Sequence, residues 1–139
     1  MRELPGQLTQ AELEELFSGP STFVSILAET TDPLGRAEEI ANGLSEPDKV
    51  EALAGHARIG EPSPEQHGGN PAVLTELAYL NQVYEEKFGF RFVVFVDRRP
   101  KAEILDVLRE RLERTRAEEL ETALRELVAI ARERWRRSG

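Results

Sequence analysis

The sequence has 139 residues, of which 40% are hydrophobic and 32% charged, as is typical of a soluble globular protein. It contains no cysteine, which excludes disulfides and thiolate chemistry, and its net charge of -8 disfavours duplex nucleic acid as a partner. No apolar run reaches the ~18 residues of a membrane span, and no secretory signal is visible. We therefore expect one domain over residues 1–139, located in the cytoplasm and bound neither to a membrane nor to nucleic acid.

The first half of the sequence predicts four helices, each with a start signal and an apolar stripe. The start signals are Thr9, Ser21 or Thr22, Asp32-Pro33 and Ser45-Glu46-Pro47-Asp48. Asp32 followed by Pro33 gives a side-chain cap and then a proline in the first turn. The second helix is expected to bury Phe23, Ile26 and Leu27 on one face, and the fourth to run into Gly55-His56.

The second half predicts three longer helices and one extended segment. Asn70-Pro71 starts a helix that continues to Phe88, with apolar residues at 73, 77, 80, 84 and 88. Residues 90–96 are the only run with strand character, and we expect a buried extended connector because a single strand has no partner. Two helices follow, one with Ile104, Leu105, Leu108 and Leu112 and one from about Ala117 to Trp135. The expected fold is an all-α, compact single-domain bundle of about seven helices with one short extended connector, residues 90–96.

Polar residues collect in the break "GHARIGEPSPEQHGG", residues 55–69. His56 follows a helix end, so it either caps that helix or donates and accepts protons near neutral pH. Glu65-Gln66 after Ser63 starts a helix or recognises a ureido group, since a carboxylate accepts N–H bonds and an amide both donates and accepts. His67 is expected to be a solvated loop residue, and we expect no metal site because no HExxH spacing or third ligand is present.

Two polar residues interrupt the apolar stripes of the predicted helices. Arg134 continues the stripe of the last helix one step beyond Ile130. It either extends to solvent at the helix end or points into a polar pocket and binds an anion with its planar guanidinium. Asn81 lies on the stripe of the helix that ends at Phe88, where it either makes a packing hydrogen bond or belongs to a site.

Four segments, in their order and spacing, resemble the OHCU (2-oxo-4-hydroxy-4-carboxy-5-ureidoimidazoline) decarboxylase family. They are "HARIGE", "SPEQ", "LNQVYEEKFGFRFVVFV" and "ILDVLRERLERTRAEELETALRELVAIARERW". The resemblance covers most of the chain and is strongest from Leu53 to Trp135. Its most specific part is Leu80-Asn81, Tyr84 and Lys87-Phe88-Gly89-Phe90 with the apolar run that follows.

The resemblance implies an all-helical homodimer that needs no cofactor and converts a small ureidoimidazoline carboxylate to S-allantoin and carbon dioxide in urate degradation. Carried over position by position, the catalytic residues are His56, Glu65 and Arg134. The substrate-binding residues are Ala57, Ser63, Gln66 and the backbone of Phe92, Val93, Val94, Phe95 and Val96. His56 would supply the proton that replaces carbon dioxide, and the 92–96 backbone groups, expected to be unpaired, would hydrogen-bond the substrate ring.

The chain departs from the family pattern at two positions beside these residues. Ala57 follows His56 where the family usually has proline, so the turn is not stiffened there. Arg91 stands where the family usually has the proline of KFGFPF, which adds a charge near the proposed pocket. Two alternatives to the decarboxylase stay open: a non-catalytic helical module that binds proteins, and a decarboxylase for a related ureido or imidazolone carboxylate.

Overall fold

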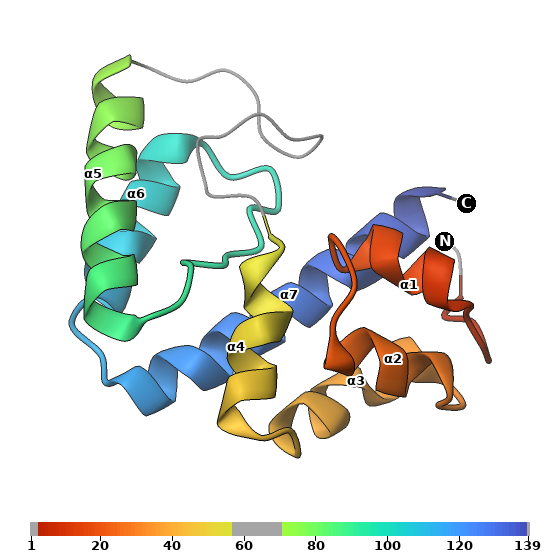
Figure 1. The fold of residues 1–139 in the computed structure, drawn as a ribbon. Helices are drawn as coiled ribbons and strands as arrows, with labels where there is room; N and C mark the ends of the chain where they lie inside the picture. Colours follow the sequence, from red (N-terminus) through yellow and green to blue (C-terminus); the bar gives the residue numbers. More distant parts are fainter. Residues whose placement is uncertain (1–2, 57–70, 139) are drawn as a thin grey trace.

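The computed structural model describes residues 3–56 and 71–138, and within them it contains seven helices and no strand (Figure 1). The helices are α1 (Gln10–Leu16), α2 (Thr22–Ala28), α3 (Pro33–Asn42), α4 (Glu46–Ala54), α5 (Pro71–Phe88), α6 (Lys101–Arg111) and α7 (Arg116–Ser138). The all-α prediction is confirmed. The last helix extends three residues beyond its expected end at Trp135.

Three helix starts form as the sequence predicts. The hydroxyl oxygens of Thr9, Ser21 and Ser45 each accept a hydrogen bond from the backbone N–H three residues later, at 3.1, 3.1 and 3.3 Å. At α1 the cap is reciprocal, because the Glu12 carboxylate accepts from the Thr9 N–H at 2.9 Å. Helix α5 begins at Pro71 as expected, while its expected cap, Asn70, lies outside the described residues.

Helix α3 begins at Pro33 as predicted, but the expected cap by Asp32 is wrong. Asp32 adopts a left-handed backbone with φ 54°, and its side chain makes no capping hydrogen bond. Its N–H instead donates to the Gly6 carbonyl at 2.8 Å. The carboxylate occupies space next to Gly35, where a Cβ would approach it to 2.3 Å. The Asp32 backbone thus contacts the N-terminal segment, and the start of α3 has no side-chain cap.

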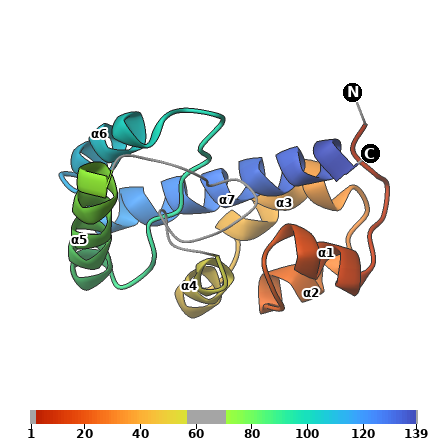
Figure 2. The ribbon, with the colours of Figure 1, turned by 90° about the horizontal axis from the view of Figure 1, so that it is seen from above.

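Helix α7 is the longest helix and runs through the molecule, with three of the other helices packed on it (Figures 1 and 2). Helices α1, α3 and α4 contact it directly, while α5 and α6 form a pair at one end of the molecule. The predicted apolar stripe of α7 is buried at Leu120, Ala123, Leu127 and Ile130. One expectation for α2 is wrong: Ile26 is 38% exposed, and Val24 is buried in its place.

The extended connector over residues 90–96 is present and contains no strand. Phe90 and Phe92 are buried against the Tyr84 ring, with centroid separations of 6.0 and 5.3 Å. Gly89, with φ 82°, ends α5 in the left-handed region that favours glycine, and a turn at residues 97–98 leads into α6. The connector passes between the α5–α6 pair and the end of α4 (Figures 1 and 2).

Candidate functional site

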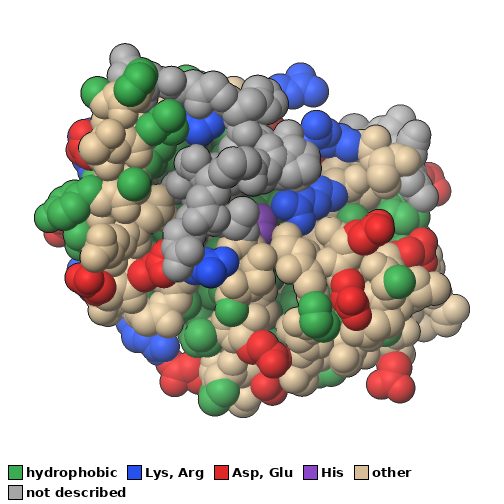
Figure 3. All heavy atoms as spheres, turned by 45° about the horizontal axis from the view of Figure 1, so that its top comes forward, with side chains coloured by type: hydrophobic (Ala, Val, Ile, Leu, Met, Phe, Trp, Pro, Cys, Tyr) green, Lys and Arg blue, Asp and Glu red, His purple; other side chains and the backbone are tan. Residues whose placement is uncertain are grey.

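His56 is the first residue beyond the C-cap of α4. The cap itself is Gly55, and the His56 N–H still donates to the Leu53 carbonyl, at 3.3 Å. The residue is only 7% exposed, so the imidazole is enclosed by protein instead of extending into solvent. In the space-filling view, Lys and Arg side chains gather beside the histidine on this face (Figure 3). Such an environment suits an anionic ligand.

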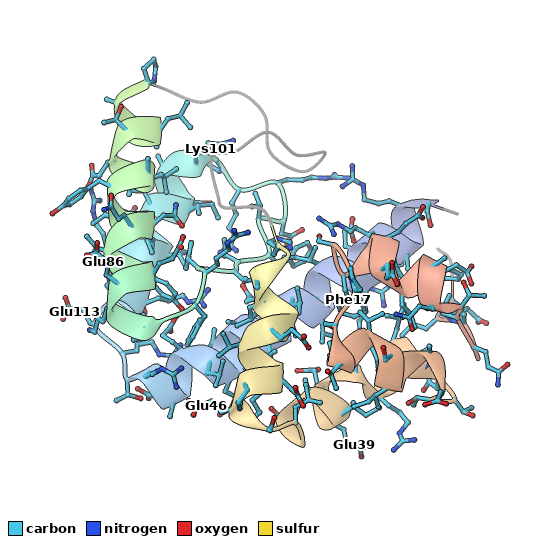
Figure 4. The ribbon with its side chains drawn as sticks, viewed as in Figure 1. Phe17, Glu39, Glu46, Glu86, Lys101 and Glu113 are labelled. Atoms are coloured by element: carbon cyan, nitrogen blue, oxygen red, sulfur yellow. The ribbon has the colours of Figure 1, made fainter. Side chains whose placement is uncertain are left out.

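Gly55 fixes the end of α4 against the turn between α1 and α2. A Cβ at position 55 would lie 2.6 Å from the backbone carbonyl oxygen of Ser18, closer than real Cβ contacts allow. Glycine is therefore required for this close approach. The turn begins at Phe17 (Figure 4), which is buried and packs edge-on against Phe23 of α2, with ring centroids 5.2 Å apart.

Arg134 reaches the same turn from α7. Its Nη1 donates to the Leu16 carbonyl at 3.1 Å and to the Ser18 hydroxyl at 2.9 Å. The guanidinium is thus held against the protein at this turn and is partly buried. Gly55, which precedes His56, and Arg134 both contact Ser18, so two of the predicted catalytic residues lie around one turn.

The backbone of the connector is more fully paired than the sequence suggested. The Val93 carbonyl accepts from Arg111 at 2.8 Å, and the Phe95 N–H donates to the Glu126 carboxylate at 3.2 Å. Arg99 donates to the carbonyls of Phe95 and Val96. The expectation that all these groups are unpaired for want of a sheet partner is therefore wrong, because side chains from α6, α7 and the following turn take that role.

Two connector residues differ from their neighbours. The backbone groups of Phe92 and Val94 make no hydrogen bond within the described part of the chain. Both residues are buried. Their amide and carbonyl groups are the part of the connector that fits the expected ring contacts.

Arg111 belongs to a buried ionic cluster that the sequence reasoning missed. Its Nε donates to Glu119 at 2.7 Å, and Glu119, which is fully buried, also accepts from the Tyr84 hydroxyl at 2.5 Å and from Arg114 at 3.0 Å. Burial, followed by the hydrogen bond to Glu119, raises the pKa of the Tyr84 phenol well above its ordinary value. The available signal was a charge three residues after Leu108 on the α6 stripe, the same kind of signal that identified Arg134.

The remaining predicted residues divide into two groups. Ala57, Ser63, Glu65 and Gln66, together with His67, lie outside the described residues. Asn81 is buried and its side-chain nitrogen donates to the Leu77 carbonyl of its own helix at 2.8 Å. In residues 3–56 and 71–138, no group of three or more His, Asp and Glu side chains is arranged to hold a metal ion. Within the same ranges, no helix is long and apolar enough to cross a membrane.

Comparison with known proteins assigns the chain to a family. Residues 7–136 match the family model described as OHCU decarboxylase. The chain belongs to the OHCU decarboxylase family. OHCU decarboxylases are lyases that act in urate degradation.

Curated relatives from three organisms show the same relationship. The uric acid degradation bifunctional protein TTL of Arabidopsis thaliana is 32% identical over 136 residues, covering 81% of this chain and 42% of that protein. The uric acid degradation bifunctional protein of Bacillus sp. (strain TB-90) is 27% identical, covering 90% of this chain and 29% of that protein. The decarboxylase of Halalkalicoccus jeotgali is 34% identical over 61 residues, covering 44% of this chain and 35% of that protein. The chain thus spans less than half the length of these relatives.

Solved structures share the fold over nearly the whole chain. An OHCU decarboxylase crystallised in the presence of (S)-allantoin superposes with a TM-score of 0.78 and 30% identity, covering 88% of this chain and 94% of that one. An (S)-allantoin synthase gives a TM-score of 0.70 at 22% identity, covering 90% of this chain and 47% of that one. The second likeness supports the fold alone.

Proposed function

We propose that this chain decarboxylates 2-oxo-4-hydroxy-4-carboxy-5-ureidoimidazoline to S-allantoin and carbon dioxide without a cofactor. Family membership and the similarity to an OHCU decarboxylase crystallised with (S)-allantoin support the reaction. The observation that carries the proposal is the meeting of Gly55 and Arg134 on Ser18, which brings the residue before His56 and the α7 guanidinium to one turn.

The proposed chemistry needs a charge stabiliser and a proton donor. The bond between the ring carbon and the carboxylate carbon breaks, carbon dioxide leaves, and the electron pair remains on the ring carbon and its conjugated carbonyl. Oriented donors stabilise that charge, and a proton delivered to one face completes the product. His56 is the proposed donor. Its burial limits delivery of protons by bulk water, and a single donor face accounts for formation of one enantiomer.

The other residues have proposed roles in binding. Arg134 orients the anionic or carbonyl oxygens of the substrate, since its guanidinium is already fixed in direction by Leu16 and Ser18. Glu65 and Gln66 are proposed to hold the ureido and ring amide groups, and Ala57 and Ser63 are further proposed substrate-binding residues. The backbone of Phe92–Val96 contacts the ring, through the groups of Phe92 and Val94 in particular.

The two histidines of the chain provide the decisive comparison. Purified parent, His56→Ala and His67→Ala are added to freshly generated substrate, and formation of S-allantoin is followed by its optical activity. We expect His56→Ala to lower the rate by about a hundredfold or more, as for loss of a general acid, and His67→Ala to match the parent. A folded His56→Ala protein as fast as the parent would contradict the proposed role. A parent that forms allantoin no faster than buffer would favour the non-catalytic module.

Three further features belong to this proposal: residues 1–139 act as one domain, the protein is a homodimer, and it is located in the cytoplasm. Size-exclusion chromatography with light scattering tests the second, since a homodimer elutes with the mass of two chains. Cell fractionation with a tagged chain tests the third.

A further inference from the structure

Arg91 makes a contact that ties the connector to the end of α4. Its Nη1 donates to the backbone carbonyl of His56 at 2.6 Å, between residues 35 positions apart in the sequence. The sequence suggested only that Arg91 adds a charge near the pocket. In the structure that charge is directed at the backbone of the proposed proton donor.

The direction of the Arg91 side chain is fixed by its neighbours. Successive side chains of an extended segment point to opposite sides. Phe90 and Phe92 are 5% and 1% exposed and both pack on Tyr84. Arg91 therefore points away from Tyr84, toward the end of α4. Burial of the two phenylalanines holds the base of the arginine side chain in place while its head remains partly exposed.

The Arg91 guanidinium meets the His56 carbonyl just past the end of α4. It lies beyond the last turn of α4, where carbonyl groups have no partner within the helix. A hydrogen bond from a guanidinium is stronger than one between neutral groups. The next residue is Ala57, so no proline ring restricts the His56 backbone from the following position. Gly55 against Ser18 holds the preceding residue, and Arg91 holds the carbonyl that follows the His56 side chain.

We propose that Arg91 is a positioning residue that fixes the backbone of His56 and thereby aims the imidazole for proton transfer. It acts through His56 and does not touch the reacting atoms. The proposal rests on the proposed function, because it assigns the contact a role in the same reaction.

The test uses two substitutions at position 91 and a matched arginine elsewhere. Arg91→Met keeps most of the length of the side chain but removes the hydrogen-bond donor, while Arg91→Lys keeps a charged donor. Arg132→Met is the control, because Arg132 makes the same type of bond, from Nε to the Leu34 carbonyl at 2.9 Å. Steady-state kinetics give kcat and KM, and chiral analysis gives the enantiomeric purity of allantoin. Circular dichroism confirms that equal fractions of each protein are folded.

We expect Arg91→Met to lower kcat by about tenfold or more, the size of effect that misplacement of a catalytic group produces, with KM changed less than kcat. Arg91→Lys should recover most of that loss, and Arg132→Met should leave kcat unchanged. Arg91→Met with the kcat of the parent would overturn the proposal. It would also be overturned if Arg91→Met and Arg91→Lys lost activity only in proportion to their unfolded fractions.

A spectroscopic measurement separates this inference from the proposed function. The ring nitrogen resonances of ¹⁵N-labelled histidine are recorded for parent and variants, and His67→Gln assigns the two histidines. We expect the His56 resonances to move in Arg91→Met and to return toward the parent positions in Arg91→Lys. If they move as expected in a protein that lacks decarboxylase activity, the proposed function fails but the positioning contact stands. If they do not move, the inference fails even in an active enzyme.

Discussion

Replacing Glu119 with glutamine tests the buried ionic cluster that connects α5, α6 and α7. The substitution keeps the shape of the side chain and removes its charge. All three partners of Glu119 are donors: Tyr84 and Arg111 donate to Oε1 and Arg114 donates to Oε2. A glutamine has one oxygen and one NH2 group, so it cannot accept from both sides. With its oxygen toward Tyr84 and Arg111, its NH2 group faces the Arg114 guanidinium.

The expected loss of stability depends on which arginine is left without an anion beside it. Arg111 is 5% exposed and would keep its positive charge with no anion beside it, while Arg114, whose side chain is 35% exposed, can turn to water. Removing one partner of a buried ion pair costs about 3–5 kcal/mol, and because glutamine preserves two hydrogen bonds we expect a loss of about 3 kcal/mol. A domain of ordinary stability has about 5–15 kcal/mol in total, so the variant stays folded but is clearly weakened.

Urea unfolding followed by circular dichroism measures the free energy of unfolding. The control is Glu121→Gln, an exposed position on the same helix, for which we expect a change within about 0.5 kcal/mol. Adding Arg111→Met to Glu119→Gln removes the uncompensated charge, so the double variant should be more stable than Glu119→Gln alone. The reasoning is refuted if Glu119→Gln behaves like Glu121→Gln, or if the second substitution brings no recovery.

The remaining predictions concern pH and a close approach of backbones. Burial and Glu119 raise the pKa of Tyr84, so above about pH 10 the unfolded chain loses a proton that the folded chain keeps. The unfolding free energy should therefore fall as pH rises above that value, and less steeply in Tyr84→Phe, as urea titrations at several pH values will show. Gly55→Ala should cost about 1–3 kcal/mol and lower activity, because its Cβ meets the Ser18 carbonyl. Gly43→Ala, with nothing nearer than 3.6 Å, should do neither when both are compared by thermal melting and rate.

Local rules predicted the features that depend on a few neighbouring residues. The caps at Thr9, Ser21 and Ser45 need only a hydroxyl and an N–H three residues later, and all three form. The rule failed at Asp32, whose backbone is left-handed and donates its N–H to the distant Gly6 carbonyl. Periodicity placed Ile26 on the buried face because a seven-residue helix fits more than one stripe, and contacts of α2 with its neighbours decided which face is covered.

The candidate site, like the fold, was predictable only where a local sequence pattern is enough. Arg134 was identified because a charge on an apolar stripe requires a partner, and the structure supplies that partner in the α1–α2 turn. Arg111 is likewise a charge on an apolar stripe, that of the shorter helix α6. Its partners Glu119 and Val93 lie in other elements. The contact of Arg91 with His56 depends on where the connector crosses α4, which no local pattern encodes.

The site is therefore assembled from contacts between segments that are distant in sequence. His56 is held at its preceding residue by the α1–α2 turn and at its carbonyl by the connector, while Arg134 reaches that turn from α7. The Gly55 and Arg91 contacts, and the Arg134 bond to the Leu16 carbonyl, are made to backbone groups, which move only if the whole segment moves. Because α1 and α4 both pack directly on α7, the helix that leads into the turn and the helix that ends at Gly55 share one base. We therefore expect substitutions that shift α4 along α7 to disturb the placement of His56 more than substitutions of similar size on the exposed side of α5.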